Sequence, residues 1–571
     1  MKNIIKDNYL IIVLMLLATA LRLWKLGEIP PGLTSDEASL GYNAYSIFKT
    51  GRDEYGELLP IVFKSFGDYK PGLYVYLTIP FIAVMGLNEW AVRLPSAIAG
   101  IVAVFLVYMF VLRLFKKDQH KTPHINHHTI AIVAAAMIAV SPWHLQFSRG
   151  AWEVNVALTL TLAGIYYFFT ALYNNKYVIL SAFFFALTLV TYQGAKLSTL
   201  IILTLLALVY FNKVKRFNLK AIIISIVVAL VIALPALTSF SKGQTGRLSV
   251  FSVFSYPRSE EYLNDFLRQD KEKVGDFKYY LYHTEGLNFL RGVMGRYFNH
   301  FSTRFLFFEG DYSNPRHSPP NHGMLFIPDI IFLITGLIVI LKDLKRPSLF
   351  ILLWFLLSPL PAVLSRDQVH AVRSLNFIIP AVVIMSIGFI YLLKVAKNNC
   401  NKILAGVVYF ILFLVYLVSF IYYFDSYYVH LPVHSAKLWH FGNKEVALEL
   451  LKKEYRDKKV LYPQSYQQPY VYFLFYGVKS GRPLAAPGEV KNLFSFKEST
   501  SGDVGLVEKI GNISFLPITW PVGIAKAGDV VVMQGEIVNY DMIGEDFKII
   551  SDIRYPNSKA TAYWILEKLS N

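Results

Sequence analysis

Cysteine is almost absent from this 571-residue chain, which contains only Cys400. A single thiol excludes an intrachain disulfide and any metal site that needs several cysteine ligands. The segments outside the membrane must therefore be stable without covalent cross-links. Internal repeats and low-complexity linkers are also missing from the sequence.

Charged residues are scarce at 17%, whereas 54% of the residues are hydrophobic and 15% are aromatic. The mean hydropathy is +0.42. Several apolar runs exceed the roughly 18 residues that mark a membrane-spanning helix, and one soluble core does not need this much apolar surface. The composition therefore predicts a polytopic membrane protein.

The formal net charge of +17 at first suggests a nucleic-acid partner. However, the Lys and Arg residues cluster in short loops between apolar runs rather than on one amphipathic face, so we expect no nucleic-acid partner. The excess of positive charge is better explained as a signal for the orientation of the chain in the membrane. The basic segments contain Lys2 and Lys6; Arg113, Lys116, Lys117 and Lys121; Lys213, Lys215, Arg216 and Lys220; Lys342, Lys345 and Arg346; and Lys394, Lys397 and Lys402.

If these segments all face the cytoplasm, the positive-inside rule predicts about eleven spans, an inner N-terminus and an outer C-terminal domain. The first apolar run lacks a convincing small-residue cleavage site, so we expect the first helix to remain as an anchor. The protein is then a multi-pass protein of the plasma membrane. The predicted spans cover residues 9–25, 94–115, 129–146, 154–173, 177–192, 196–212, 219–239, 323–341, 347–364, 371–394 and 402–424.

The apolar stretch from Leu73 to Leu87 does not fit this scheme as a span. It has only about fifteen residues, contains Pro80, and suits an interfacial or re-entrant helix. We therefore interpret residues 26–93 as one long outer loop with membrane-parallel helices. A second outer loop is expected over residues 241–322.

The predicted domains are a transmembrane domain, residues 1–425, and an extracytoplasmic soluble domain, residues 426–571. The second part combines helical periodicity at Lys444–Lys453 with short strand-like runs at Lys459–Leu461, Val530–Met533 and Phe547–Ile550. Such a mixture is typical of a small α/β module.

The most informative motif is the acidic turn Thr34-Ser35-Asp36-Glu37, at the start of a helical run that ends near Thr50 and Gly51. Thr34 and Glu37 can form a capping box, so Glu37 has both a structural and a catalytic interpretation. Asp36 lies in the first turn, where the helix dipole favours its ionised form. Carboxylates at the mouth of a membrane helix bundle are costly, which makes Asp36 a candidate general base.

A second motif, Gly67-Asp68-Tyr69-Lys70-Pro71-Gly72, precedes the interfacial helix. Pro71 suits the first helical position and Asp68 could cap the helix. Lys70 has no comparable structural role. A cation at the membrane face near Asp36 could bind an anionic headgroup or the phosphate of a lipid-linked substrate.

Several cations lie on the predicted outer side, against the orientation rule. They could pair with neighbours such as Glu153 and Asp367, or snorkel to the interface in the case of Arg93. Alternatively, several loops could build one shared anion site. These positions are Arg149, Lys196, Arg366, His370 and Arg373.

The turn-rich segment Asp311–Gly323 adds Arg316, His317 and His322, which could reach a ligand. Two histidines and an acid can bind a metal, but their spacing is not diagnostic, so metal dependence stays open. The cluster of His124, His127 and His128 lies in a basic loop and is better explained as solvated surface.

Together, four motifs resemble known membrane glycosyltransferases. They are the acidic pair after the first span, the Lys-Pro motif, Arg93-Leu94-Pro95-Ser96 at the second span, and the Ser148-Arg149 turn after the third. Their order and placement are similar to those of the dolichyl-phosphate-mannose protein mannosyltransferases and the lipid A aminoarabinose transferase. Both families have the C-type glycosyltransferase (GT-C) fold, and the resemblance covers about residues 1–400.

The resemblance implies an α-helical polytopic protein that transfers a hexosyl or pentosyl group, with inversion, from a polyprenyl-phosphate donor. By motif position, Asp36 is the implied base, with Glu37 beside it. The proposed phosphate and substrate ligands are Lys70, Asp68, Arg149, Lys196, Arg316, His317, Arg366, His370 and Arg373. The families carry a second acid directly before the Lys-Pro motif. Tyr69 stands there in this chain, which puts the role of Asp68 in question.

A transporter or flippase of a lipid-linked saccharide is the alternative function. It would use the same cations, but it needs substrate residues near the bilayer midplane and often has duplicated halves. The sequence shows no repeat, and its charged residues gather at the outer face. The implied partners are the polyprenyl-phosphate sugar, membrane lipids, and an acceptor that is a glycan, a lipid or a protein. No cofactor is certain, although a divalent metal stays open.

Overall fold

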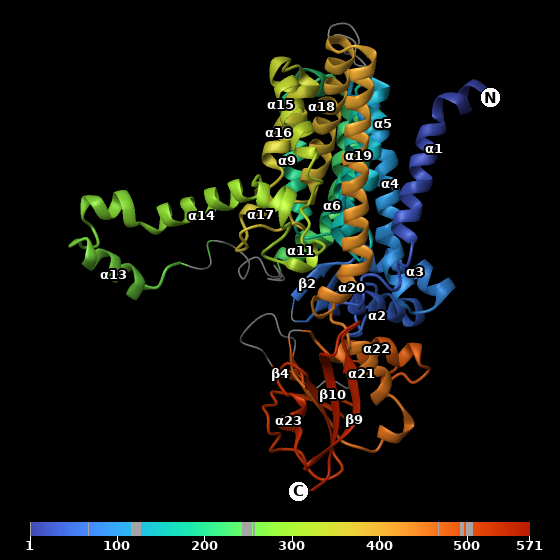
Figure 1. Ribbon diagram of the computed structural model, residues 1–571, viewed down its shortest axis with the longest axis vertical. Helices are drawn as coiled ribbons and strands as arrows, with labels where there is room; N and C mark the ends of the chain where they lie inside the picture. Colours follow the sequence, from blue (N-terminus) through green and yellow to red (C-terminus); the bar gives the residue numbers. More distant parts are fainter. Residues whose placement is uncertain are drawn as a thin grey trace.

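The computed structural model describes residues 2–570 except 67, 116–126, 242–253, 255–256, 466, 491–495 and 498–505. A long helical bundle forms one end of the molecule and a β-sheet with short helices forms the other (Figure 1). A layer that contains α2, α3 and β2 lies between them. The basic segment at Lys116–Lys121 and the residues His124 and Gly67 fall outside the described residues.

Each of the eleven predicted spans overlaps at least one helix, although α15 begins only at Asp329 and α18 only at Ile378. Within the described part of the chain, six helices are long and apolar enough to cross a membrane, or seven if α5 and α6, bent by 58°, form one span. The protein is therefore a multi-pass membrane protein, while the count of eleven stays a prediction. The bundle contains α1 (Lys2–Leu23), α4 (Glu89–Phe115), α5 (His127–Val140), α6 (Pro142–Ser148), α7 (Glu153–Ala171), α8 (Tyr177–Leu189), α9 (Ala195–Val209), α10 (Phe211–Val214), α11 (Leu219–Ser241), α15 (Asp329–Lys342), α16 (Arg346–Leu357), α17 (Leu360–Val363), η5 (Leu375–Phe377), α18 (Ile378–Asn399) and α19 (Lys402–Asp425).

Small residues allow close helix packing inside this bundle. A Cβ atom on Gly336 of α15 would lie 2.0 Å from the carbonyl oxygen of Ile384 of α18. A Cβ on Gly388 of α18 would lie equally close, 2.0 Å, to the carbonyl oxygen of Phe332. Only glycine fits at both positions, so the two backbones can touch, as is common between membrane helices.

The first outer loop begins with α2 (Ser35–Thr50), whose N-terminus has the predicted capping box: Thr34 accepts from the Glu37 N–H, and the Glu37 side chain accepts from the Thr34 N–H. Gly51 ends the helix in the left-handed region, with φ 72°. This is a common helix stop, because glycine meets no Cβ penalty there. The local signals at both ends of α2 are thus confirmed.

The Lys-Pro motif folds differently from the expectation. Residues Asp68–Pro71 form strand β2, which pairs antiparallel with β1 (Val62–Ser65). Helix α3 starts only at Leu73 and runs to Met85, with Gly72 before it and no side-chain cap. Pro71 is therefore not the first helical residue and Asp68 does not cap the helix. The two-stranded ribbon accommodates proline, which lacks a ladder donor, at an edge position.

The second outer loop contains an arm that extends sideways from the bundle (Figure 1). Its elements are α13 (Glu260–Gln269), η2 (Tyr279–His283) and α14 (Glu285–Asn299). The chain then returns to the bundle through η3 (Arg304–Phe308) and η4 (Pro315–His317). This return segment places Arg316 and His317 next to the layer that contains α2.

The C-terminal part contains a mixed six-stranded sheet with the order β6-β7-β3-β8-β10-β9. Strand β3 is parallel to β7 and β8, and the remaining pairs are antiparallel. The predicted strand-like runs fall on β3, β8 and β9, and the predicted helix on α21, but the prediction did not include α22 or β10. The elements are η6 (Ser426–His430), α20 (Leu431–His434), η7 (Lys437–Trp439), α21 (Asn443–Leu450), η8 (Lys453–Tyr455), β3 (Val460–Pro463), α22 (Tyr470–Lys479), β4 (Phe496–Lys497), β5 (Leu506–Val507), β6 (Lys509–Ile510), β7 (Ile513–Leu516), β8 (Val530–Gln534), α23 (Tyr540–Ile543), β9 (Phe547–Arg554) and β10 (Thr561–Lys568).

Helix α22 packs against the predicted first outer loop and so connects it with the sheet. Its residues Tyr470–Gly477 are all buried, and they share one apolar core with α2, α3 and the start of α4. The carboxylate of Glu89, the first residue of α4, accepts hydrogen bonds from Lys479 (2.7 Å) and Tyr476 (3.2 Å) and pairs with Lys444 (2.9 Å). The domain boundary at residues 425 and 426 stays a prediction.

Candidate functional site

Asp36 lies in the first turn of α2, at the junction of the bundle, the first outer loop and the C-terminal part. Its side chain is 47% exposed and forms an ion pair with Lys70 of β2, whose side chain is 21% exposed. Both residues line a small pocket together with Asn43, Phe63 and Ser65. The structure therefore brings together the two residues that the sequence singled out, a solvent-accessible carboxylate and a cation.

Glu37, the next residue, lies in the opposite environment. Its carboxylate is buried and accepts from Arg93 Nε at 3.0 Å and Nη2 at 3.3 Å. The backbone N–H groups of Thr34 and Ala151 donate to it at 3.0 and 2.9 Å. All of these contacts are with the protein itself, which supports the structural interpretation of Glu37.

The side chain of Arg149 also forms its hydrogen bonds inside the protein. It is buried, and its terminal nitrogens donate to the carbonyl oxygens of Leu21 (2.8 Å), Arg22 (3.1 Å), Trp24 (2.6 Å) and Ile29 (3.2 Å). A cation at this position satisfies the carbonyl groups at the C-terminal end of α1, where the helix dipole is negative. This explains a positive charge on the outer side without a bound anion.

Arg93 and Arg22 act in a similar way. Besides Glu37, Arg93 donates to the carbonyl oxygens of Leu26 (3.0 Å), Pro30 (3.1 Å) and Gly32. Arg22 donates to the carbonyl oxygen of Ala139 at 3.1 Å, at the end of α5. Buried arginines therefore bind the carbonyl groups at the ends of the first helices, and Arg93 also binds Glu37 of the acidic turn.

His440 is a site residue that the sequence analysis missed. It precedes α21 and has the left-handed backbone conformation, φ 55°, which is unfavourable for a residue with a Cβ. Its Nδ1 accepts from the backbone N–H of Ser35 (3.3 Å) and is hydrogen-bonded to the Tyr472 hydroxyl (2.8 Å). The C-terminal part thus reaches the residue next to Asp36.

The pKa of His440 shows which charged groups lie near its imidazole. Burial, with a further contribution from Arg316, lowers the pKa of His440 to about 3, while Asp36 acts in the opposite direction. His440 is therefore neutral at physiological pH. Arg316 and Asp36 therefore both lie near enough to act on His440, and the Arg316 guanidinium lies 5.6 Å from the Trp152 ring centre.

Arg373 lies in the loop before α18, where it pairs with Asp367 at 3.4 Å and interacts with Tyr192. Tyr192 and Arg373 also line a pocket whose other walls are mainly apolar residues of α7, α9 and the loop before α18. The pocket has a volume of only about 10 Å³, which is room for about one water molecule.

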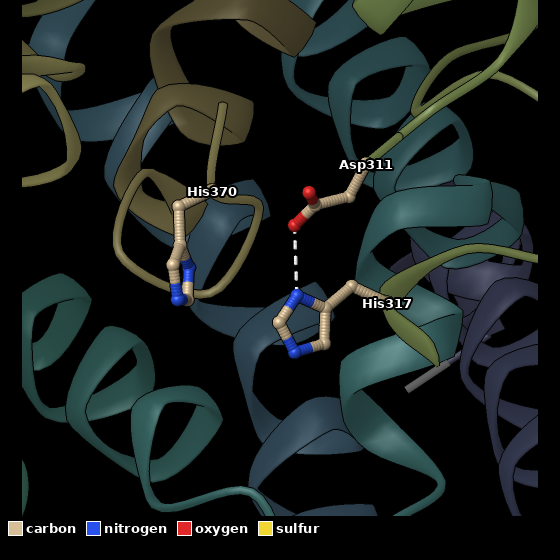
Figure 2. A group of neighbouring side chains, drawn as sticks. All are labelled: Asp311, His317 and His370. Atoms are coloured by element: carbon tan, nitrogen blue, oxygen red, sulfur yellow. Dashed lines mark hydrogen bonds and ion pairs between the residues drawn. The ribbon is translucent and has the colours of Figure 1, made fainter. Parts of the chain in front are cut away.

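Asp311, His317 and His370 form a buried cluster, shown in Figure 2. Asp311 Oδ2 accepts from His317 Nδ1 (2.7 Å) and from the backbone N–H of Ala371 (2.7 Å), and Oδ1 accepts from the N–H of Asn314 (3.0 Å). Burial lowers the pKa of His317, against the opposing effect of Asp311, and it lowers the pKa of His370 well below its usual value. Both imidazoles are therefore neutral.

The cluster matches a metal site in residue type, because one ligand atom from each residue lies within 4.8 Å of the others. However, the carboxylate already has three N–H donors, and Arg316 and Arg373 both act on His317 electrostatically. Nearby positive charge opposes a cation. A second group, Asp270, Glu272 and His283, lies on the arm and is more exposed. Metal dependence stays a hypothesis.

The remaining predicted residues are more scattered. Asp68 is buried in β2, where Oδ1 accepts from the Tyr69 N–H at 2.7 Å. Lys196 is half-buried in the first turn of α9, and Arg366 is exposed in the loop before α18. His322 Nδ1 is hydrogen-bonded to the carbonyl oxygen of Gly323 at 2.8 Å, and the ring stacks on Tyr422. These side chains are not brought together around one position where they could bind the same ligand.

Residues 69–238 match the model of the family described as dolichyl-phosphate-mannose-protein mannosyltransferase. The putative mannosyltransferase YkcB of Bacillus subtilis (strain 168) is 25% identical over 227 residues, which are 39% of this chain and 29% of YkcB. The match therefore spans less than a third of that curated relative.

Two solved structures are similar over nearly their full length. ArnT from Cupriavidus metallidurans in the apo state has a TM-score of 0.53 and 13% identity, with 97% of each chain covered. The same protein bound to undecaprenyl phosphate has a TM-score of 0.52 and 12% identity, with 98% of each chain covered. The expected fold is thereby confirmed: the chain has the GT-C fold of integral membrane glycosyltransferases.

Proposed function

We propose that this protein is an inverting glycosyltransferase that moves a sugar from a polyprenyl-phosphate donor to an acceptor hydroxyl on the outer face of the plasma membrane. The observation that carries the proposal is the half-exposed Asp36 beside Lys70, while the adjacent Glu37 is buried. Only Asp36 of the two is accessible to a substrate. The similarity to a mannosyltransferase family and to ArnT, which was solved with undecaprenyl phosphate, gives the donor class.

The donor phosphate would lie between Lys70, Arg316 and Arg373. An anionic leaving group in a cleft of low dielectric is stabilised best by several preorganised cations. The first part of the polyprenyl tail would pack against the apolar residues of α7 that lie beside Tyr192 and Arg373, namely Val154, Ala157 and Leu158. Arg149 is not included, because four carbonyl oxygens use its donors.

In the proposed reaction, a carboxylate oxygen of Asp36 accepts the proton of the acceptor hydroxyl. The acceptor oxygen then forms a bond to the anomeric carbon as the bond between that carbon and the phosphate oxygen breaks. The electron pair of the broken bond leaves with the polyprenyl phosphate. No acid is needed for this step if Lys70, Arg316 and Arg373 stabilise the charge of the leaving group.

The ion pair between Lys70 and Asp36 gives the donor a second role. In the free protein, Lys70 compensates the carboxylate of Asp36. A donor phosphate competes for the same ammonium group, so its binding leaves Asp36 more available to an acceptor hydroxyl. This order of events couples activation of the base to the presence of the donor.

A release assay tests the proposal. Purified protein is incubated with a panel of polyprenyl-phosphate hexoses and pentoses, with and without a chelator, and free polyprenyl phosphate is measured. We expect release from at least one donor, and a product whose anomeric configuration is opposite to that of the donor. No release from any donor would contradict the proposal and favour transport of a lipid-linked saccharide.

A further inference from the structure

A second and larger cavity lies where the C-terminal part meets the first helices of the chain. It has a volume of about 210 Å³ and lies between the loop that joins α1 to α2, the start of α4, and the segments around α21 and α22. A single water needs roughly 10–15 Å³ of such space. The cavity is therefore large enough for a group the size of one sugar ring.

The wall of this cavity is rich in groups that recognise hydroxyls. One carboxylate oxygen of Glu445, Oε2, is buried and has no hydrogen-bond partner among the described residues. A buried acceptor without a donor is costly, so this position is suited to a ligand or water that donates a proton. The polar and aromatic lining residues are Glu28, Glu89, His440, Lys444, Glu445, Tyr472 and Tyr476.

The charges of the wall argue against an anionic ligand. Lys444 is the only lysine in the lining, and it is paired with Glu89 at 2.9 Å. His440 is neutral because its pKa is lowered to about 3, chiefly by burial. The wall therefore offers no surplus cation for a phosphate, in contrast to the region around Lys70, Arg316 and Arg373. A neutral ligand with several hydroxyls fits it better.

The cavity is connected to Asp36 by a short chain of contacts. His440 and Tyr472 both line it, and His440 Nδ1 accepts from the backbone N–H of Ser35, the residue before Asp36. The unfavourable left-handed conformation of His440 is retained at this junction. The C-terminal part, which lies next to α2 in Figure 1, thus brings the cavity wall to the residue before Asp36.

We infer that this cavity is the acceptor subsite and that it binds a saccharide, with Glu445 accepting hydrogen bonds from its hydroxyls. The inference rests on the proposed glycosyltransferase function and deepens it, because it makes the acceptor a glycan or glycolipid headgroup. It also gives the C-terminal part a function: α21 and α22 complete the active site from below α2.

A binding experiment with the full-length protein in detergent tests this inference. The probes are methyl glycosides of common hexoses and pentoses, and binding is measured by saturation-transfer NMR. We expect at least one methyl glycoside to bind, with its Kd raised about tenfold or more in Glu445→Ala and Glu445→Gln, since a hydrogen bond to a charged group is lost. Binding of polyprenyl phosphate should change less than twofold in both variants.

Glu449→Gln is the matched control. Glu449 lies on the same helix, pairs with Lys452 at 2.6 Å, and is not part of the cavity wall. This variant should bind the glycoside like the wild type. The inference is wrong if no methyl glycoside binds to the wild type, if the Glu445 variants bind it equally well, or if they lose polyprenyl phosphate instead.

The outcome is separable from that of the release assay. Release of polyprenyl phosphate without any effect of Glu445 on glycoside binding would overturn only the acceptor subsite. Glycoside binding that depends on Glu445, together with no release from any donor, would overturn only the proposed reaction and leave a saccharide-binding cavity.

Discussion

Asp36 and Glu37 are adjacent acids in one helical turn, yet they lie in different regions of the molecule. Asp36 is about half exposed and has Lys70 as its partner, whereas Glu37 is buried among Arg93 and two backbone N–H groups. Adjacent residues of a helix point about 100° apart, so one turn can serve both a cleft and a core. An acidic pair in a sequence therefore need not act as a pair.

The two regions also differ in how they use arginine and lysine. In the core beside Glu37, Arg93 and Arg149 donate to backbone carbonyl oxygens at the ends of helices, and Arg93 also pairs with Glu37. The three proposed phosphate ligands, Lys70, Arg316 and Arg373, are only partly buried. The difference separates residues that should affect stability from residues that should affect turnover, and the following variants test that separation.

The largest effect is expected for Asp36→Asn. The amide keeps the size of the side chain but cannot accept a proton, so turnover should fall about 1,000-fold or more. The free energy of unfolding should change little, because the side chain is half exposed. The measurements are release of polyprenyl phosphate per folded molecule and thermal unfolding in detergent. Turnover within tenfold of the wild type would exclude Asp36 as the base.

Glu37→Gln should act on stability instead. Removing one partner of a buried ion pair leaves Arg93 without a counter-charge and costs about 3–5 kcal/mol. We expect a lower unfolding temperature and a lower yield of folded protein, with turnover per folded molecule reduced far less than in Asp36→Asn. An unchanged unfolding temperature would contradict the structural role.

Lys70→Gln should reduce turnover about 100-fold, which corresponds to about 2.7 kcal/mol of lost stabilisation of the leaving group. The affinity for polyprenyl phosphate should fall in the same variant. Lys64→Gln, on the paired strand β1, is the control, because Lys64 lies over Tyr55 at 5.1 Å and outside the wall of the Asp36 pocket. Equal losses in both variants would mean that the ribbon, not the charge, matters.

Glu54 extends the comparison to a buried acid that has no ion pair among the described residues. Burial raises its pKa to about 8, above the ordinary 4.5, while Asn43 donates to it at 3.2 Å. The folded state thus holds the proton more tightly than the unfolded chain, so stability is greatest below about pH 4.5 and falls as the pH rises to about 8. Glu54→Gln should flatten this dependence, so the variant should unfold at a higher temperature than the wild type at pH 8. An unchanged pH profile of thermal unfolding would contradict this.

Arg149→Lys is expected to have the smallest effect. A lysine keeps the charge but loses most of the four carbonyl contacts, which should cost about 1–2 kcal/mol. The affinity for polyprenyl phosphate should stay within about twofold of the wild type, as measured by binding and thermal unfolding. A large loss of affinity with normal stability would restore Arg149 as a phosphate ligand.

Local sequence signals predicted a large share of the fold. The capping box of Thr34 and Glu37 and the stop at Gly51 are contained within single turns, and each predicted span overlaps at least one helix. The strand at Asp68–Pro71 escaped prediction, because its partner strand and not its own residues determines it.

The candidate site was predictable only where its residues lie close in sequence. Asp36 and Lys70 come from one outer loop, and the motif order pointed to both. His440 is separated from Ser35 by 405 positions and shows no local pattern, so only the folded chain reveals it. The sequence alone leaves two roles open for Arg149, since a charge on the predicted outer side can satisfy helix ends as well as a ligand.

One side-by-side measurement tests the central claim most directly. Wild type, Asp36→Asn and Glu37→Gln are purified, the folded fraction of each is determined, and release of polyprenyl phosphate per folded molecule is compared with the donor found in the panel. We predict that Asp36→Asn folds like the wild type and loses about 1,000-fold in turnover, while Glu37→Gln folds poorly and keeps most of its turnover per folded molecule. The reverse pattern, with Glu37→Gln folded but inactive and Asp36→Asn active, would contradict the account.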